Sequence, residues 1–163
     1  MIVPATSPTQ INTAAQLAHT IWNQHYVPII GQEQVNYMLE KFQSAEAITR
    51  QIDNGYNYFL IYHNGLPCGY LALVPNTTEQ KMMLSKIYVD ANYRGLQLGK
   101  QLMNFAITET QKLHFKTLWL TVNKYNTNSI EWYKKQGFTI KKELKIDIGN
   151  GFVMDDYMME KLM

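Results

Sequence analysis

The stretch from Ile87 to Lys100 reads IYVDANYRGLQLGK, and its character changes twice along its length. Apolar and β-branched residues at its start are typical of a strand, and the polar residues Asp90–Leu96 indicate a loop. A helix is expected to begin directly afterwards, and the backbone N–H groups of a first helical turn are unpaired and attract phosphate. Arg94 and Lys100 add formal positive charge at the same place. The stretch therefore predicts a phosphate-binding corner, with an ordinary turn at Gly95 as the alternative.

A second segment, Asn126–Phe138, reads NTNSIEWYKKQGF. Its pattern predicts a short helix over Ser129–Gln136 that Gly137 ends, because glycine readily adopts the left-handed backbone found after a helix. Asn128 or Ser129 is expected to cap this helix. On its own the segment indicates only local structure, with its aromatic residues as core packing.

The rest of the chain alternates between helical and strand patterns, and the pairs Asn64-Gly65 and Asn150-Gly151 predict tight hairpin turns. Spacings of three and four between apolar residues predict helices, and aromatic or β-branched runs predict strands. The predicted helices are Ile11–Trp22 with Thr9 as its cap, Val35–Phe42, Ser44–Asp53 and Gly99–Leu113. The predicted strands are Tyr58–His63, Leu66–Val74, Met82–Val89, Thr117–Val122, Phe138–Ile148 and Phe152–Glu160. Because a strand–helix–strand unit needs parallel neighbours, the expected fold class is α/β (α+β), with a mixed sheet flanked by helices.

Length and composition fit one domain over residues 1–163. Hydrophobic residues make up 46% of the chain, enough for a substantial core, and a net charge of only +2 with scattered Lys and Arg argues against a nucleic-acid partner. The single cysteine, Cys68, excludes an internal disulfide and indicates a reducing compartment, so a cytoplasmic location is expected. The sequence shows no secretory signal, no apolar run of membrane-spanning length and no metal-ligand spacing among its histidines. We therefore expect no membrane partner and no metal.

Taken together, the two segments resemble the GNAT acetyltransferase superfamily. The first is similar to the family's pyrophosphate-binding motif, in which an arginine precedes spaced glycine positions, here Arg94 and Gly99. The second is similar to the family's Asn…Ala-Ile-x-x-Tyr-x-x-x-Gly-Phe signature. The matching residues are Asn126, Ser129 in the alanine place, Ile130, Tyr133, Gly137 and Phe138. The resemblance extends from about Gln10 to the end of the chain.

The resemblance implies an N-acetyltransferase that uses acetyl-CoA as cosubstrate. The parallel strands Met82–Val89 and Thr117–Val122 are expected to splay, with the pantetheine arm in the opening. The residues implied in binding acetyl-CoA are Ile87, Tyr88 and Val89 on the strand, Arg94, Gly95, Leu96, Gln97, Leu98, Gly99 and Lys100 in the corner, and Asn126, Ser129 and Tyr133. Tyr133 is also implied as the catalytic acid, because a phenol of pKa about 10 can protonate the leaving thiolate. The alternative for Tyr133 is a core aromatic.

Two positions depart from the family pattern. Gln97 stands where the motif usually has glycine, so its side chain is expected either to crowd the phosphate or to contact it. Ser85 stands where many relatives carry a glutamate that serves as general base. A base or a water path is needed, because an alkyl ammonium is only about one part in a thousand neutral at pH 7. The candidate bases are Glu79, His63 and either Asp155 or Asp156, each with a plain surface role as the alternative.

The acceptor is expected to be a small primary amine. Tyr26–Gly31, which contains Pro28 and Gly31, is read as a break after the first helix. The stretch Tyr26–Gln32 and the helix Val35–Phe42 that follows resemble the group that acetylates polyamines such as spermidine. The carboxylates suggested for a polycation are Glu33, Glu40 and Glu46. Two alternatives stay open: acetylation of a protein N-terminus or lysine, and a GNAT-fold sensor that binds acyl-CoA with little turnover. The sequence also leaves open whether the protein is a homodimer.

Overall fold

The computed structural model describes residues 1–163, and the chain separates into two compact units. The first unit comprises Met1–Pro75 and Leu84–Ala106, and the second comprises Asn76–Met83 and Ile107–Met163. Three elements, two strands and a helix, cross from one unit to the other. The expectation of a single domain over residues 1–163 stays a prediction.

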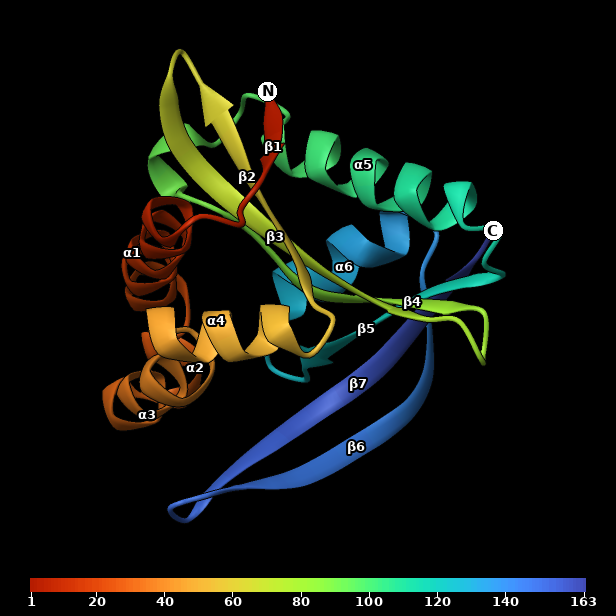
Figure 1. Ribbon diagram of the computed structural model, residues 1–163. Helices are drawn as coiled ribbons and strands as arrows, with labels where there is room; N and C mark the ends of the chain where they lie inside the picture. The colour runs from red at the N-terminus through yellow and green to blue at the C-terminus, as the bar shows by residue number, and fades with distance from the viewer. The chain divides into compact units, whose positions relative to one another are not determined.

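After a short strand, the first unit continues with four helices (Figure 1): α1 (Pro8–His25), α2 (Val27–Ile30), α3 (Gln32–Phe42) and α4 (Ala45–Asp53). Ser7 caps α1, because its side chain accepts from the Gln10 backbone while the Gln10 side chain bonds back to the cap, so the prediction of Thr9 as the cap is wrong. The expected break after α1 contains the single helical turn α2, which ends at Gly31 with a φ of +84°. The cap predicted at Ser44 is confirmed by its bond from the Ala47 backbone N–H.

The strands of the first unit are β1 (Ile2–Pro4), β2 (Asn57–His63), most of β3 (Leu66–Asn76) and the larger part of β4 (Lys81–Val89). The predicted hairpin between β2 and β3 is confirmed, with positive φ angles of 50° at Asn64 and 76° at Gly65. The strand β1 pairs antiparallel with β2, and the sequence analysis missed it. Three residues are too short for an alternation of apolar and polar side chains to be recognised.

The second unit contains β5 (Thr117–Asn123), α6 (Thr127–Lys135), β6 (Thr139–Gly149) and β7 (Phe152–Leu162). The hairpin at Asn150-Gly151 is confirmed by positive φ angles at both residues. The helix α5 (Leu98–Lys112) crosses from the first unit into the second. The helix predicted over Gly99–Leu113 ends one residue earlier, at Lys112, and Leu113 is 49% exposed.

The strands form one seven-stranded sheet in the order β1-β2-β3-β4-β5-β7-β6. The strand β4 (Lys81–Val89) pairs parallel with β5 over Lys81–Met83 and Thr117–Trp119, whereas β1–β2, β2–β3, β5–β7 and β6–β7 pair antiparallel. The mixed α/β fold with helices flanking the sheet is therefore confirmed. No helix has the length and hydrophobicity needed to cross a membrane.

Candidate active site

The loop after β4 is held at its start by the last turns of α1. Gln24 donates from its side-chain nitrogen to the Asp90 carboxylate at 3.1 Å and accepts the Ala91 backbone N–H at 3.1 Å. The Asp90 carboxylate also accepts the Asn92 backbone N–H at 2.9 Å and so caps the short helical turn Ala91–Tyr93. These bonds fix the direction in which the loop leaves the strand.

The end of β4 lies against the backbone of β3. A side chain at Gly69 would place its first carbon 2.5 Å from the Tyr88 carbonyl oxygen and 3.3 Å from the Val89 Cα, so only glycine fits. The neighbouring carbonyl of Cys68 accepts the Asp90 backbone N–H at 2.8 Å. Cys68 itself is fully buried, consistent with packing. The backbone of β4 that the resemblance implies in pantetheine binding is therefore fixed from the β3 side.

The corner Arg94–Lys100 turns into α5 through two left-handed residues, Gly95 with a φ of +81° and Gln97 with a φ of +60°. The family glycine that Gln97 replaces thus occupies a position that needs positive φ, and a residue with a side chain pays about 1 kcal/mol there. Gln97 still begins the helix, because its carbonyl accepts the Gln101 backbone N–H at 3.0 Å.

The side chains of the corner differ in burial: one is buried and anchors the helix, and most of the others are exposed to solvent. Leu98 is 4% exposed and anchors the first turn of α5 in the core of the first unit. Arg94, Gly95, Leu96, Gln97 and Lys100 are exposed, and Gly99 is half-buried. The predicted cofactor residues of this corner therefore form one accessible surface at a helix start, where unpaired N–H groups and two cations favour an anion.

Tyr88 of β4 belongs to an aromatic cluster that the first unit builds with α1 and β3. Its ring centroid lies 5.3 Å from that of Tyr70, 5.8 Å from Trp22 and 6.2 Å from Tyr26. Trp22 and Tyr70 are buried, whereas Tyr26 and Tyr88 are half-buried with hydroxyl oxygens 3.4 Å apart. Two half-buried phenol rings with adjoining hydroxyls suit an organic ammonium, which aromatic rings attract through their quadrupoles.

The carboxylates suggested for a polycation lie on α3 and α4, the helices that follow Tyr26 along the chain. Glu33, Glu40 and Glu46 are all exposed. Glu40 lines a hollow of the first unit, whose walls come from α1, α3 and the turn before α4. The lining residues are Ala15, His19, Asn36, Leu39, Glu40, Gln43 and Ser44.

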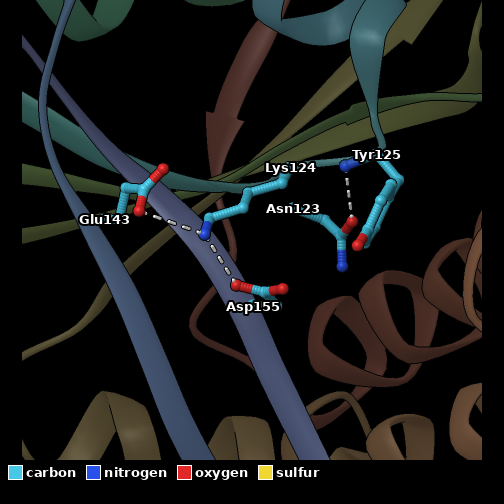
Figure 2. Close-up of polar contacts among 5 residues, drawn as sticks. All are labelled: Asn123, Lys124, Tyr125, Glu143 and Asp155. Atoms are coloured by element: carbon cyan, nitrogen blue, oxygen red, sulfur yellow. Dashed lines mark hydrogen bonds and ion pairs between the residues drawn. The ribbon is translucent and has the colours of Figure 1, made fainter.

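In the second unit, the turn after β5 is held by its own polar groups. The Asn126 backbone N–H donates to the Asn123 carbonyl at 3.0 Å, and the Tyr125 N–H donates to the Asn123 side chain at 2.9 Å. Figure 2 shows Lys124 extending to Asp155 and Glu143, with ion pairs of 3.0 and 3.5 Å. The turn is thereby tied to both strands of the β6–β7 hairpin.

The helix α6 begins at Asn126, which is the N-cap residue although its side chain makes no cap bond. The prediction of Asn128 or Ser129 as the cap is wrong, because the tight turn after β5 starts the helix two to three residues earlier. Asn126 is 3% exposed and its carbonyl accepts the Ile130 N–H at 3.1 Å. Ser129 is half-buried in the first turns of the helix.

Tyr133 lies half-buried on α6, with its ring centroid 5.5 Å from Trp132 and 5.9 Å from Phe138. The helix ends at a predicted glycine, because Gly137 has a φ of +96° and its N–H donates to the Lys134 carbonyl. Phe138 follows and is buried. These contacts fix the ring while leaving part of the side chain accessible, so packing and proton donation are compatible in this residue.

The four candidate bases have different surroundings. Glu79 is exposed in the β3–β4 turn, and His63 is half-buried at the end of β2. Asp155 forms the ion pair with Lys124. Asp156 alone is buried, at 4% exposure, and its pKa is raised to about 6 by burial and by the negative charge of Asp155, opposed by a hydrogen bond with the Thr121 side chain. A carboxylate with a pKa just below neutral suits general-base chemistry.

Lys86 on β4 is a buried charge that the sequence analysis missed. Its Nζ donates to the Phe42 carbonyl at 2.8 Å, to the Gln51 side-chain oxygen at 2.9 Å and to the Tyr58 hydroxyl. No carboxylate is among these partners, and burial lowers the pKa of Lys86 to about 7. The signal was present in the sequence, since Met82, Leu84 and Lys86 share one face of a strand by their spacing of two.

Comparison with known proteins places the two motifs in one family. The acetyltransferase (GNAT) family matches residues 17–138. An uncharacterized N-acetyltransferase from Methanocaldococcus jannaschii is 31% identical over 54% of this chain, a stretch that spans only 41% of that relative's length.

Solved structures agree in fold. The PaiA N-acetyltransferase from Thermoplasma acidophilum, solved in complex with coenzyme A, superposes with a TM-score of 0.82 at 20% identity, covering 100% of this chain and 99% of that one. A ribosomal-protein-alanine N-acetyltransferase from Brucella melitensis superposes with a TM-score of 0.65 at 21% identity, covering 100% and 99% of the two chains.

Proposed function

The chain belongs to the GNAT acetyltransferase family, and on that premise we propose that this N-acetyltransferase moves the acetyl group of acetyl-CoA to a small primary amine. The observation that carries the proposal is the exposed basic corner Arg94–Lys100, which turns through Gly95 and Gln97 directly into the unpaired N–H groups of α5. Such a corner is suited to the pyrophosphate of a coenzyme A derivative.

In this proposal acetyl-CoA is held by backbone groups and by side chains of the residues that the resemblance implies. The pyrophosphate accepts from the N–H groups at the start of α5 and pairs with Arg94 and Lys100. The backbone of Ile87–Val89, fixed by the close contact at Gly69, supplies hydrogen bonds to the pantetheine arm. Asn126 and Ser129 contribute from the start of α6.

The transfer needs one proton taken from the amine and one given to sulfur. The neutral amine attacks the thioester carbonyl, and a backbone N–H near Val89 stabilises the oxyanion that forms. The carbon–sulfur bond then breaks, the amide remains on the acceptor, and Tyr133 protonates the leaving thiolate. Asp156 accepts the proton that the acceptor ammonium must lose before it attacks, in place of the glutamate that many relatives carry where this chain has Ser85.

A polyamine is the first choice of acceptor. The support is the aromatic cluster of the first unit, in which Tyr26 and Tyr88 present rings and hydroxyls that suit an alkylammonium. Tyr26 also opens the stretch that resembles the polyamine-acetylating group. The exposed carboxylates Glu33, Glu40 and Glu46 favour a substrate with more than one positive charge.

A protein N-terminus is the second candidate acceptor. One observation favours it: the neighbour from Brucella melitensis, whose name gives it a ribosomal-protein alanine as substrate, covers the whole of this chain. Both acceptors are primary amines and use the same chemistry, so only the choice of acceptor separates the two candidates.

Thiol release from acetyl-CoA tests the proposal with spermidine, putrescine, lysine, an aminoglycoside and peptides with free N-termini as acceptors. We expect activity with spermidine, a rate that rises from pH 7 towards pH 9 as more amine is neutral, and a KM for acetyl-CoA that rises about tenfold or more in Arg94→Ala but not in the exposed control Arg50→Ala. Activity confined to peptides would favour the second candidate. No release with any acceptor, despite tight acetyl-CoA binding, would favour the sensor.

The base assignment is tested by two adjacent carboxylates. Asp156→Asn should lower kcat/KM about a hundredfold, the usual loss when a general base is removed, whereas Asp155→Asn should change it less than about threefold. In the wild type kcat/KM should fall below about pH 6, where Asp156 becomes protonated, and this limb should vanish in Asp156→Asn. Equal effects of the two substitutions would contradict the assignment.

A further inference from the structure

The last strand of the sheet, β6, has an open edge. It is eleven residues long, pairs with β7 on one side only and contains no proline (Figure 1). Eight of its residues are exposed, including Ile140 at 39% and Ile146 at 46%. Natural proteins usually shorten or block such edges, because the unpaired N–H and C=O groups of a long edge strand invite pairing with another chain. At the opposite edge β1 has only three residues and ends in Pro4.

The sequence of β6, TIKKELKIDIG, is complementary to itself when two copies run antiparallel with Leu144 opposite Leu144. In that register Glu143 faces Lys145 of the partner subunit, and Asp147 faces Lys141 of the partner subunit. Each pair occurs twice by symmetry, and no like charges meet. On the other face of the strand, the Leu144 pair and the pairs of Ile140 with Ile148 of the partner subunit are apolar, whereas Lys142 lies opposite Ile146 of the partner subunit. Opposite charges directly across a strand pair stabilise it, and like charges destabilise it.

Two neighbouring registers also place the same face of both strands on the same side of the sheet, and both are unfavourable. Centring the pair on Glu143 brings Glu143 against its own copy and Lys141 against Lys145. Centring it on Lys145 brings Lys145 against its own copy and Glu143 against Asp147. The charge pattern therefore selects the register centred on Leu144 among its nearest alternatives.

The geometry of β6 leaves this register accessible. Its pairing with β7 is regular over Lys142–Asp147, with irregularities only between Ile140 and Lys142 and between Asp147 and Gly149. Lys145 forms no ion pair within the chain, and Glu143 makes only the 3.5 Å contact with Lys124 while its side chain remains 67% exposed. The residues at the centre of the register can therefore pair with another copy at little cost.

We propose that β6 is a homodimer interface, at which it pairs antiparallel with β6 of a second copy about a two-fold axis at Leu144. The two sheets become continuous, the strand edge is closed, and Glu143 lies between Lys124 of its own chain and Lys145 of the partner subunit.

A single cysteine at the axis tests the register. Leu144→Cys places two thiols on β-carbons about 5 Å apart, so mild oxidation should give a disulfide-linked dimer. Ile146→Cys is the matched control, because its two copies would be separated by about 13 Å along the strands and should not cross-link. Cys68 is fully buried and is present in both variants. Equal cross-linking of the two variants, or of neither, would overturn the register.

Charge reversal tests the interface itself by sedimentation over a range of protein concentrations. The wild type should be a dimer. Glu143→Lys should raise the dimer Kd about tenfold or more, because two attractive pairs become repulsive. The double variant Glu143→Lys with Lys145→Glu should restore the wild-type Kd. A wild type that stays monomeric, or a double variant no tighter than Glu143→Lys alone, would overturn the proposal.

Discussion

Each compact unit buries one lysine or carboxylate side chain that has no partner of opposite charge: Lys86 in the first and Asp156 in the second. Burial moves their pKa values in opposite directions, down to about 7 for Lys86 and up to about 6 for Asp156. The physical cause is the same, since a low-dielectric interior disfavours whichever form is charged.

The two groups differ in what surrounds them. Lys86 donates to three fixed acceptors, on α3, α4 and β2, so its hydrogen-bonding capacity is used up in tying helices to strands. Asp156 has the Thr121 side chain as its hydrogen-bond partner and a second negative charge beside it at Asp155. A shifted pKa alone therefore does not mark a catalytic group. A saturated set of partners indicates a structural role, and spare acceptor capacity leaves a group able to take a proton.

The largest expected effect concerns Lys86. The unfolded state keeps a lysine pKa near 10.5 and the folded state one of about 7, so between these values the unfolded chain binds more protons and stability rises with pH. The full rise is about 5 kcal/mol at about 1.4 kcal/mol per pKa unit. Urea unfolding from pH 6 to pH 10 should show about 4 kcal/mol of this rise in the wild type and none of it in Lys86→Met. The exposed control Lys116→Met should keep the rise of stability with pH. If the rise persisted in Lys86→Met, Lys86 would not be its cause.

The next largest effect concerns Asp156, which changes the stability with pH in the opposite direction. Its folded pKa of about 6 lies above the unfolded value of 3.8, so between them the folded chain binds more protons and stability falls as pH rises. The fall is about 3 kcal/mol. Asp156→Asn should abolish it and therefore be at least as stable as the wild type at pH 7, although its activity is lost. Asp155→Asn serves as the control in the same unfolding series, and a strongly destabilised Asp156→Asn would assign this carboxylate a structural role.

The smallest effect tests whether the partners of Lys86 matter individually. The Tyr58 hydroxyl donates to Gln51 and accepts from Lys86, and Tyr58→Phe removes both bonds. We expect a loss of about 2 kcal/mol below pH 7, where Lys86 is charged, and a smaller loss at pH 10. Tyr125→Phe, at a side chain that is 69% exposed, should change stability by less than about 0.5 kcal/mol. A loss that is independent of pH would mean that the hydroxyl serves Gln51 alone.

Local signals in the sequence predicted most of the elements. The Asn-Gly pairs at 64–65 and 150–151 specify positive φ at both residues, and Gly137 specifies the end of α6, because these conformations depend on neighbours in the chain. Errors arose where a longer-range contact competed with a local one. Asn126 rather than Asn128 begins α6 because the turn after β5 is pulled tight by Asn123 and Lys124.

The sequence by itself determined the family, the mixed sheet and the corner Arg94–Lys100, because motif spacing, hydrophobic period and turn residues are all local properties of the chain. Only the tertiary structure decided which of two adjacent aspartates is buried, that Lys86 carries its charge among uncharged partners, and that Gln97 occupies a left-handed position. The physical reason is that burial and backbone strain depend on residues brought together from distant parts of the chain. Asp155 and Asp156 have the same chemistry and differ only because successive side chains of a strand point to opposite faces of the sheet.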